Sequence, residues 1–383
     1  MPTPECFASV PPFPDDVPTV ELQRVELRKL LSSGDAAESD ALFEACTGLG
    51  FFRLDLRGCA EGESLLKEVE AAFDVGREFY ALSDEEKSRF PLLPSNLGYK
   101  PIGGTKIEDG RPDRCEIYSL PTDDLLALAP PTTSNHPPPF AKSRPLLTSC
   151  AKHMHSVADT ILTHLSAHLA LPPRTLPSMH ALTQRSPSNL RFLHMPPQQP
   201  ASAAQTSLMG HTDNGSVTVL FNVVGGLQVH DGTADGWRYV RPEAGHAIVN
   251  LGDSMVQLTG GVVRSNMHRV VPAPGAQSES PRFSIAYVLK PPYACRMERL
   301  KGEGIPRGEE EKVGTYEEFH AKKSKGIREG KNLVGSRGGK KTEKKDGCEI
   351  ERGDGVERPG EWRCRTSIED HAMTLGVISL VFY

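Results

Sequence analysis

The stretch Met209-Gly-His-Thr-Asp-Asn-Gly-Ser-Val-Thr-Val-Leu-Phe221 joins a short polar motif to a run of branched and aromatic residues that is typical of a β-strand. Similar short runs, separated by Gly, Asn and Asp, fill most of residues 189–289, for example at 226–229, 247–250 and 283–288. Closely spaced short strands with turn signals between them predict an all-β sandwich or barrel as the core of the fold.

The polar motif in this stretch has the residue types of a metal site. Side chains alternate along an extended segment, so His211 and Asp213 point to the same face. A second histidine, His268, begins another strand-like run downstream. Two imidazoles and one carboxylate can bind one face of an octahedral iron(II), which leaves three adjacent positions for a chelating cosubstrate and O2. A lone histidine in a β core is usually a hydrogen-bonded core residue, but the ordered set of three favours iron ligands.

A second polar pair, Arg282 and Ser284, lies in the run Arg-Phe-Ser-Ile-Ala-Tyr287. The same alternation puts these two side chains on one face of the strand and Phe283 and Ile285 on the other. An arginine can give a carboxylate two parallel charge-assisted hydrogen bonds, and a serine adds a third donor. A metal site and an anion clamp on neighbouring strands suit a dicarboxylate that chelates iron at one end and is held at the other.

The first half of the chain mixes helix-type periodicity with a short strand. The expected elements are helices over 35–47, 65–80 and about 147–171 and a strand over 50–56. Pro172-Pro173 predicts the end of the last of these helices. We therefore expect an N-terminal helical and mixed region over residues 1–180 and the β core over residues 181–295.

The last part of the chain carries basic runs amid Gly and Ser. Lys322-Lys-Ser-Lys325 and the run at 340–345 offer little apolar surface to bury, so burial cannot offset the entropy of ordering them. We expect residues 296–383 to be a C-terminal extension that is largely disordered, above all over 322–370. Acidic residues interrupt the runs and no aromatic residues interleave, which indicates a solvated tail rather than a surface for nucleic acid or membrane.

Taken together, these motifs resemble the iron(II)/2-oxoglutarate-dependent dioxygenases of the isopenicillin-N-synthase-like family. The resemblance covers about residues 15–295, and its core segments are Leu190–Pro197, His211–Val229, Val249–Asp253, His268–Val271 and Arg282–Ala286. It implies a mostly β fold with packed helices, in which a double-stranded β-helix (jelly-roll) core is joined to an N-terminal α/β region.

The resemblance also implies roles for the polar residues. The iron ligands of the family fall on His211, Asp213 and His268. Its cosubstrate-binding pair falls on Arg282 and Ser284, which would hold the far carboxylate of 2-oxoglutarate. No catalytic residue is expected beyond the metal ligands.

Two positions depart from the family pattern. Met195 stands where a Tyr before Pro often donates a hydrogen bond to the cosubstrate, and Gly260 stands where Asn is common. We therefore expect 2-oxoglutarate to be held by one hydrogen bond fewer than usual.

The function implied is an Fe(II)/2-oxoglutarate-dependent oxygenase that oxidises a small organic molecule of secondary metabolism. It would use Fe(II) and O2 and convert 2-oxoglutarate to succinate and CO2. One alternative is a 2-oxoglutarate-independent non-haem iron oxidase on the same scaffold, in which Arg282 holds a substrate carboxylate. The other is a non-catalytic binding protein, which an intact set of three ligands argues against.

Composition narrows the remaining classes. The formal net charge is −5, which argues against nucleic-acid binding through bulk charge. The mean hydropathy of −0.38 and the lack of a long apolar run argue against a membrane span. The N-terminus shows no basic or apolar leader, and the eight cysteines form no C-x-x-C pair. These features predict a cytoplasmic protein with reduced thiols. We also expect a monomer whose partner is a small-molecule substrate.

Two weaker signals favour ordinary structural roles. His164 and His168 have the spacing of a helical zinc pair, but residue 165 is Leu rather than the Glu that a metalloprotease needs as a base, so we expect a polar helix edge. Gly225-Gly226 does not belong to a G-x-G-x-x-G, so no Rossmann-type nucleotide site is expected.

Overall fold

The computed structural model describes residues 4–32, 35–93, 95–107, 110–128, 135–198, 206–233, 236–307 and 313–328, and three short strands between residues 342 and 365. The helices are α1 (Pro4–Ala8), α2 (Leu27–Leu31), α3 (Ala36–Thr47), α4 (Ala60–Tyr80), α5 (Asp84–Ser88), α6 (Thr122–Leu126), α7 (Pro138–Lys142), α8 (Arg144–His168), α9 (Thr175–Met179), α10 (Asp253–Leu258), the 3-10 helix η2 (Gly275–Glu279) and α11 (Tyr316–Arg328). The strands are β1 (Arg24–Glu26), β2 (Phe51–Asp55), β3 (Gly98–Lys100), β4 (Glu116–Pro121), β5 (Asn189–Met195), β6 (Leu208–His211), β7 (Val217–Asn222), β8 (Leu227–His230), β9 (Trp237–Tyr239), β10 (His246–Leu251), β11 (His268–Val270), β12 (Arg282–Leu289), β13 (Thr342–Lys345), β14 (Cys348–Glu351) and β15 (Cys364–Arg365).

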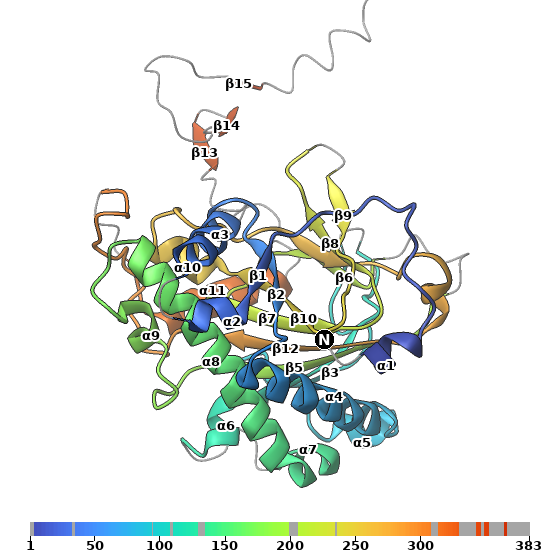
Figure 1. Ribbon diagram of the computed structural model, residues 1–383. Helices are drawn as coiled ribbons and strands as arrows, with labels where there is room; N and C mark the ends of the chain where they lie inside the picture. Colours follow the sequence, from blue (N-terminus) through green and yellow to red (C-terminus); the bar gives the residue numbers. More distant parts are fainter. Residues whose placement is uncertain are drawn as a thin grey trace, which may run out of the picture.

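Two mostly antiparallel sheets form the core. The larger has eight strands in the order β1-β2-β10-β7-β12-β5-β4-β3, and the smaller has four in the order β6-β11-β8-β9. The smaller sheet lies over part of the larger one (Figure 1). Strands that are neighbours in a sheet come from distant parts of the chain, as where β12 lies between β7 and β5. This is a double-stranded β-helix, which confirms the predicted fold class.

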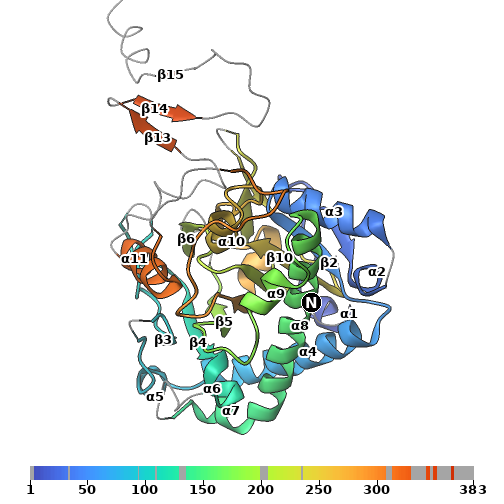
Figure 2. The same ribbon diagram turned by 90° about the vertical axis from the view of Figure 1, so that its left-hand side faces the viewer.

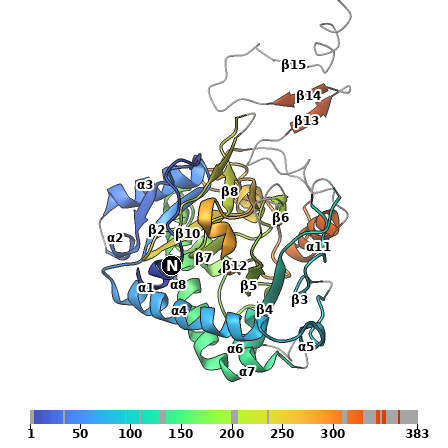
Figure 3. The same cartoon turned by 90° about the vertical axis from the view of Figure 1, so that its right-hand side faces the viewer.

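Helices cover the outer face of the larger sheet. Helices α4 and α8 pack on each other and on β12, and α4, α6 and α7 lie on the side of the larger sheet away from the smaller one (Figures 1 and 3). On this outer face the hydroxyl of Tyr287 lies 3.1 Å from Nδ1 of His155 in α8. On the inner face, Ala286 and Val288 of β12 share an apolar cluster with Val270 of β11 in the smaller sheet. The alternation along β12 therefore separates a helix-packed face from one that looks into the space between the sheets.

The N-terminal half contains the predicted elements. Helices α3, α4 and α8 and strand β2 confirm the predictions made from periodicity. Helix α3 begins after Asp35, whose side chain accepts a hydrogen bond from the backbone N–H of Glu38. Strands β1 to β4 join the larger sheet, so this half contributes half of the strands of that sheet. Within the described residues, no helix is both long and apolar enough to cross a bilayer.

The C-terminal part differs from the expectation of disorder. Helix α11 covers residues 316–328, so disorder beginning at residue 322 is wrong for this segment. The helix is anchored by Tyr316, which is fully buried in a cluster with Leu258 and Met297. Figure 2 shows α11 at the side of the core near β6. Strands β13, β14 and β15 form a small antiparallel sheet, and the rest of the predicted tail lies outside the described residues.

Candidate active site

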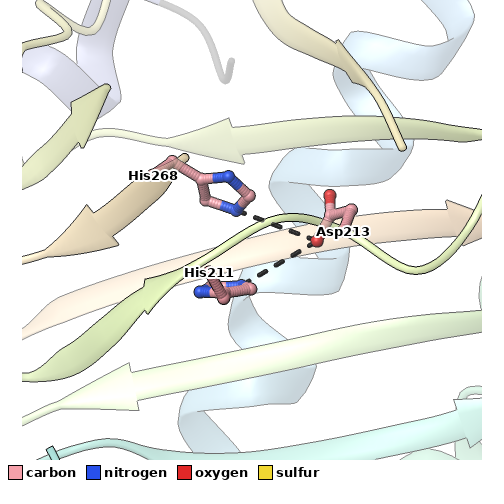
Figure 4. Close-up of side chains that lie close together, drawn as sticks. All are labelled: His211, Asp213 and His268. Atoms are coloured by element: carbon pink, nitrogen blue, oxygen red, sulfur yellow. Dashed lines mark ion pairs between the residues drawn. The ribbon is translucent and has the colours of Figure 1, made fainter. Parts of the chain in front are cut away.

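The three predicted metal ligands come together at one place. His211 at the end of β6 pairs directly with His268 at the start of β11, and Asp213 follows two residues after β6. One ligand atom from each side chain lies within 4.8 Å of the others. Oδ1 of Asp213 is 3.9 Å from Nε2 of His211 and 3.8 Å from Nε2 of His268 (Figure 4). In the described part of the chain this is the one cluster of three or more His, Cys, Asp or Glu side chains with such geometry.

The backbone fixes the orientation of both imidazoles. Nδ1 of His211 lies 2.9 Å from the carbonyl oxygen of Met209, and Nδ1 of His268 lies 3.2 Å from that of Asn266. A carbonyl only accepts, so each Nδ1 carries the hydrogen and each Nε2 presents its lone pair to the cluster. Burial, together with the charge of the neighbouring His268, lowers the pKa of His211 to about 4, which keeps the His211 ring neutral at physiological pH.

The carboxylate of Asp213 is oriented in the same way. Its Oδ2 accepts hydrogen bonds from Oγ1 of Thr218 at 2.5 Å and from Nδ2 of Asn250 at 2.8 Å. Burial alone would raise the pKa of Asp213, but the two histidines and these two hydrogen bonds bring it well below its usual range. An ionised carboxylate oxygen therefore faces two imidazole lone pairs.

This arrangement fits a divalent metal ion. The contacts between Asp213 and the two histidines are too long for hydrogen bonds, so three electron-rich atoms face one another in a largely buried setting. A cation among them would remove this mutual repulsion. Hydrogen bonds to the far side of each ligand are the usual support of a protein metal site.

The predicted anion clamp lies on β12. Arg282 donates from Nε to the carbonyl oxygen of Gly225 at 2.8 Å and from Nη1 to Oγ of Ser284 at 3.0 Å. Both residues are buried, and burial lowers the pKa of Arg282 to about 10. Among the described residues, no carboxylate pairs with Arg282. A buried guanidinium without a counter-ion is a costly arrangement unless an anion binds to it.

The positions that depart from the family pattern have structural explanations. Met195 lies directly across from Arg282 in the β5–β12 pairing, with its sulfur 4.0 Å from Nη1 of Arg282. It therefore lies beside the clamp, where the expected tyrosine hydroxyl would be useful. Gly260 has a φ of 63°, a left-handed conformation that Gly and Asn adopt more easily than other residues do.

His164 and His168 have the structural role that was predicted for them. Oγ of Ser39 lies 2.8 Å from Nδ1 of His164 and 3.0 Å from Nε2 of His168. Nε2 of His164 lies 3.0 Å from the carbonyl oxygen of Leu30. These contacts tie α8 to α3 and α2, so the pair forms a polar helix edge rather than a metal site.

Several residues at the site were not found from the sequence. Thr218 and Asn250 support Asp213, and each is a polar residue inside a mostly apolar strand, which was a usable signal. Lys323 of α11 donates to Oγ1 of Thr212 at 2.9 Å and pairs with Asp253, next to the ligand loop. Nothing in the sequence around Lys323 indicated these partners.

Comparisons with known proteins place this geometry in a family context. Residues 186–291 match the model of the 2OG-Fe(II) oxygenase superfamily. Residues 17–140 match a model described as the non-haem dioxygenase in morphine synthesis N-terminal region. The first range contains the three ligand candidates and both clamp residues.

Curated fungal proteins are similar over most of the chain. The chain is 34% identical over 280 residues to the 2-oxoglutarate-dependent dioxygenase frbH of Dothideomycetidae sp., covering 72% of this chain and 81% of that protein. It is 30% identical over 275 residues to the 2-oxoglutarate-dependent dioxygenase gloE of Glarea lozoyensis, covering 71% of this chain and 80% of that protein.

Solved structures share the fold. A full-length protein of Neurospora crassa, solved in complex with alpha-KG, superposes with a TM-score of 0.67 at 20% identity, covering 82% of this chain and 97% of that one. The dioxygenase for auxin oxidation of rice gives a TM-score of 0.60 at 27% identity, covering 80% and 97%.

Proposed function

Because the chain belongs to the 2OG-Fe(II) oxygenase superfamily and is a 2-oxoglutarate-dependent dioxygenase, we propose that its iron is held by His211, Asp213 and His268. The far carboxylate of 2-oxoglutarate then binds Arg282 and Ser284. One observation carries this assignment: three electron-pair donors converge within 4.8 Å. It is supported by the buried guanidinium of Arg282, which has no carboxylate partner among the described residues and lies on the inner face of the larger sheet.

The chain prepares these sites before any ligand binds. When bound, iron(II) and 2-oxoglutarate supply the oxidising power, as O2 is consumed and 2-oxoglutarate is converted to succinate and CO2. The backbone carbonyls of Met209 and Asn266 hold the imidazole protons away from the metal position. Thr218 and Asn250 keep Asp213 ionised and turned toward the histidines. The ligand forms and orientations are therefore fixed by the fold rather than by the metal.

The clamp is suited to a carboxylate. Its guanidinium is held by Gly225 and Ser284, so little side-chain freedom is lost when an anion binds. Apolar side chains on the same face, among them Leu193 and Val288, exclude water and strengthen the charge–charge attraction.

We further propose the region that forms the catalytic unit and the class of substrate. Residues 181–295 supply the oxygenase core, residues 1–180 supply the covering helices and four strands, and the extension begins at residue 296. The substrate is a small organic molecule, and the role is in secondary metabolism. Support comes from the structures of the Neurospora crassa protein that contain thymine or 5-formyluracil and from the fungal origin of many relatives. The 2-oxoglutarate-independent oxidase is not favoured, because the relatives are named as 2-oxoglutarate-dependent.

Anaerobic spectroscopy tests the assignment. Iron(II) followed by 2-oxoglutarate should produce a weak visible charge-transfer band, which Asp213→Ala abolishes and the exposed control Asp74→Asn retains. Iron binding without a band on adding 2-oxoglutarate would support the oxidase alternative. Failure to bind iron would support a non-catalytic binding protein.

A further inference from the structure

Two further cations, the half-buried Arg191 and the buried Lys290, lie on the inner face of the larger sheet. Arg191 of β5 pairs with Ala286 of β12 and with Ser119 of β4. Because paired residues share a face, Arg191 lies on the same face as Ala286 and, by alternation, as Ser284. Lys290 directly follows β12, two residues beyond Val288 of that same face.

Lys290 reaches the loop that carries a metal ligand. A Cβ added to Gly215 would lie 3.1 Å from Cγ of Lys290, so the stem of the lysine packs on the backbone two residues after Asp213. Among the described residues, the charge of the Asp213 carboxylate acts on both cations, and the charge of Arg191 acts on Lys290. The two cations therefore share a neighbourhood beside the proposed iron site.

Neither cation has an acidic partner among the described residues. Nε of Arg191 donates to Oγ of Ser119 at 3.2 Å, which leaves the ends of the guanidinium for another ligand. Lys290 is 4% exposed, and no hydrogen bond from its ammonium joins it to the described chain. Burial lowers the pKa of Lys290 to about 7 and lowers that of Arg191 as well. An anion bound beside Lys290 would favour its protonated form.

The formal charges in the space between the sheets leave an excess of positive charge. The formal charges of iron(II) and the 2-oxoglutarate dianion sum to zero. The formal charges of Arg282 and Asp213 also sum to zero. Arg191 and Lys290 then remain as uncompensated positive charge in a region of low dielectric. The molecule that must still enter this space during turnover is the substrate to be oxidised.

Apolar side chains surround these cations. Leu193, Ala286 and Val288 are buried on the same face, and Ile117 and Leu220 are partly accessible beside them. A ligand that suits this surface has an apolar body and a single anionic group. A carboxylate fits best, because its two oxygens can accept from one guanidinium and one ammonium.

We infer that Arg191 and Lys290 bind the carboxylate of the substrate, so that this dioxygenase acts on a small organic acid with an apolar body. The inference rests on the proposed function, because it takes the iron and 2-oxoglutarate sites as assigned there. It makes Arg191 and Lys290 specificity-determining residues that contact substrate rather than iron.

Binding without turnover tests this directly. The full-length protein, loaded with Mn(II) and 2-oxoglutarate under anaerobic conditions, is titrated by calorimetry with phenylacetate, 3-phenylpropanoate and indole-3-acetate, and with the primary amide of each acid. At least one acid should bind tenfold or more tightly than its amide. Arg191→Met and Lys290→Met should each remove that preference, and the exposed control Lys152→Gln should retain it. Equal binding of acid and amide, no binding of any acid, or a preference that survives both variants would overturn the inference.

Stability gives a second readout that separates a binding role from a structural one. An unpaired buried charge destabilises a fold, so Lys290→Met should raise the melting temperature of the ligand-free protein while it abolishes the preference for acids. A lowered melting temperature would show that Lys290 supports the fold instead, and would count against the inference even if Arg191→Met failed to fold.

Titration with 2-oxoglutarate distinguishes this failure from that of the proposed function. Both variants should retain wild-type affinity for 2-oxoglutarate. If they lose it, Arg191 and Lys290 hold the cosubstrate and the inference is wrong. If the wild-type protein itself does not bind 2-oxoglutarate, the proposed function fails first.

Discussion

The two ends of the inner face of β12 carry buried cations that are built differently. Arg282 at one end and Lys290 just past the other are each 4% exposed. Arg282 is held by two hydrogen bonds, from Nε to Gly225 and from Nη1 to Ser284. Lys290 has no such bonds within the described chain, and burial lowers its pKa to about 7, against about 10 for Arg282.

This difference reflects two kinds of ligand. A guanidinium that is always charged and rigidly held suits a cosubstrate that binds in one geometry at every turnover. A flexible ammonium with a lowered pKa suits a ligand whose arrival supplies the missing charge. Asp213 lies near the Lys290 end, because it is hydrogen-bonded by Thr218, which pairs with Val288 of β12.

The largest expected effect on activity comes from removing a ligand of the proposed iron site. His211→Ala or His268→Ala should abolish turnover, because two remaining ligands cannot hold iron(II) in a reactive geometry. Bound iron and succinate release are the measurements. Activity like that of wild type in either variant would contradict the assignment of the ligands.

The next effect concerns the Arg282 end alone. Arg282→Lys keeps the charge but loses the planar fork, so the apparent KM for 2-oxoglutarate should rise by about ten- to a hundredfold. Iron content should stay at the wild-type level. An unchanged KM would mean that another group holds the far carboxylate.

A third prediction concerns a contact outside β12 that supports the ligand loop. Lys323 of α11 pairs with Asp253 and donates to Thr212, so Lys323→Met should lower the free energy of unfolding by about 1–3 kcal/mol. Lys322→Met, exposed one residue earlier in the same helix, is the matched control. Urea unfolding of both variants decides whether α11 is part of the folded unit. Equal stability of Lys323→Met and wild type would support the expectation that the extension is disordered from residue 322.

The effect of Lys290 on stability should depend on pH. Because folding lowers the pKa of Lys290 from 10.5 to about 7, the penalty for burying its charge is full below pH 7 and fades as the pH rises toward 10. The stability advantage of Lys290→Met over wild type should therefore shrink across that window, by at most about 1.4 kcal/mol per pH unit. Urea titrations at several pH values measure it. A difference that does not depend on pH would show that Lys290 is not desolvated in this way.

The smallest effect should come from strengthening the Arg282 end. Met195 lies across from Arg282, so Met195→Tyr can place a hydroxyl beside the bound carboxylate. Binding of 2-oxoglutarate should tighten by about 0.5–1.5 kcal/mol. Calorimetry with Met195→Phe as the control separates the hydroxyl from the ring, and equal affinities of the two variants would rule out the added hydrogen bond.

The site residues that could be predicted from the sequence are those that form a pattern over a few neighbouring residues. His211 and Asp213, like Arg282 and Ser284, are two residues apart, so strand alternation alone was enough to place each pair on one face. Arg191 and Lys290 are single cations whose significance depends on the register of β4, β5 and β12, which no local pattern reveals.

Helix α11 illustrates the same limit. Its composition is polar and basic, which predicted a solvated tail. Its packing depends on partners far along the chain: Tyr316 meets Leu258 and Met297, and Lys323 meets Asp253. Such long-range contacts outweigh the local tendency to disorder.

The most direct test of the two-ended site is a crossed binding measurement on the anaerobic Mn(II)-loaded protein. Affinities for 2-oxoglutarate, and for the tightest-binding organic acid at saturating 2-oxoglutarate, are compared among wild type, Arg282→Lys and Lys290→Met. If the two ends bind different ligands, each variant weakens the binding of one ligand only. Arg282→Lys should lower the affinity for 2-oxoglutarate by tenfold or more and leave that for the organic acid unchanged, and Lys290→Met should lower the affinity for the organic acid by a similar factor and leave that for 2-oxoglutarate unchanged. If both variants weaken the same ligand, the two cations serve one site, and the separation of cosubstrate from substrate along β12 is wrong.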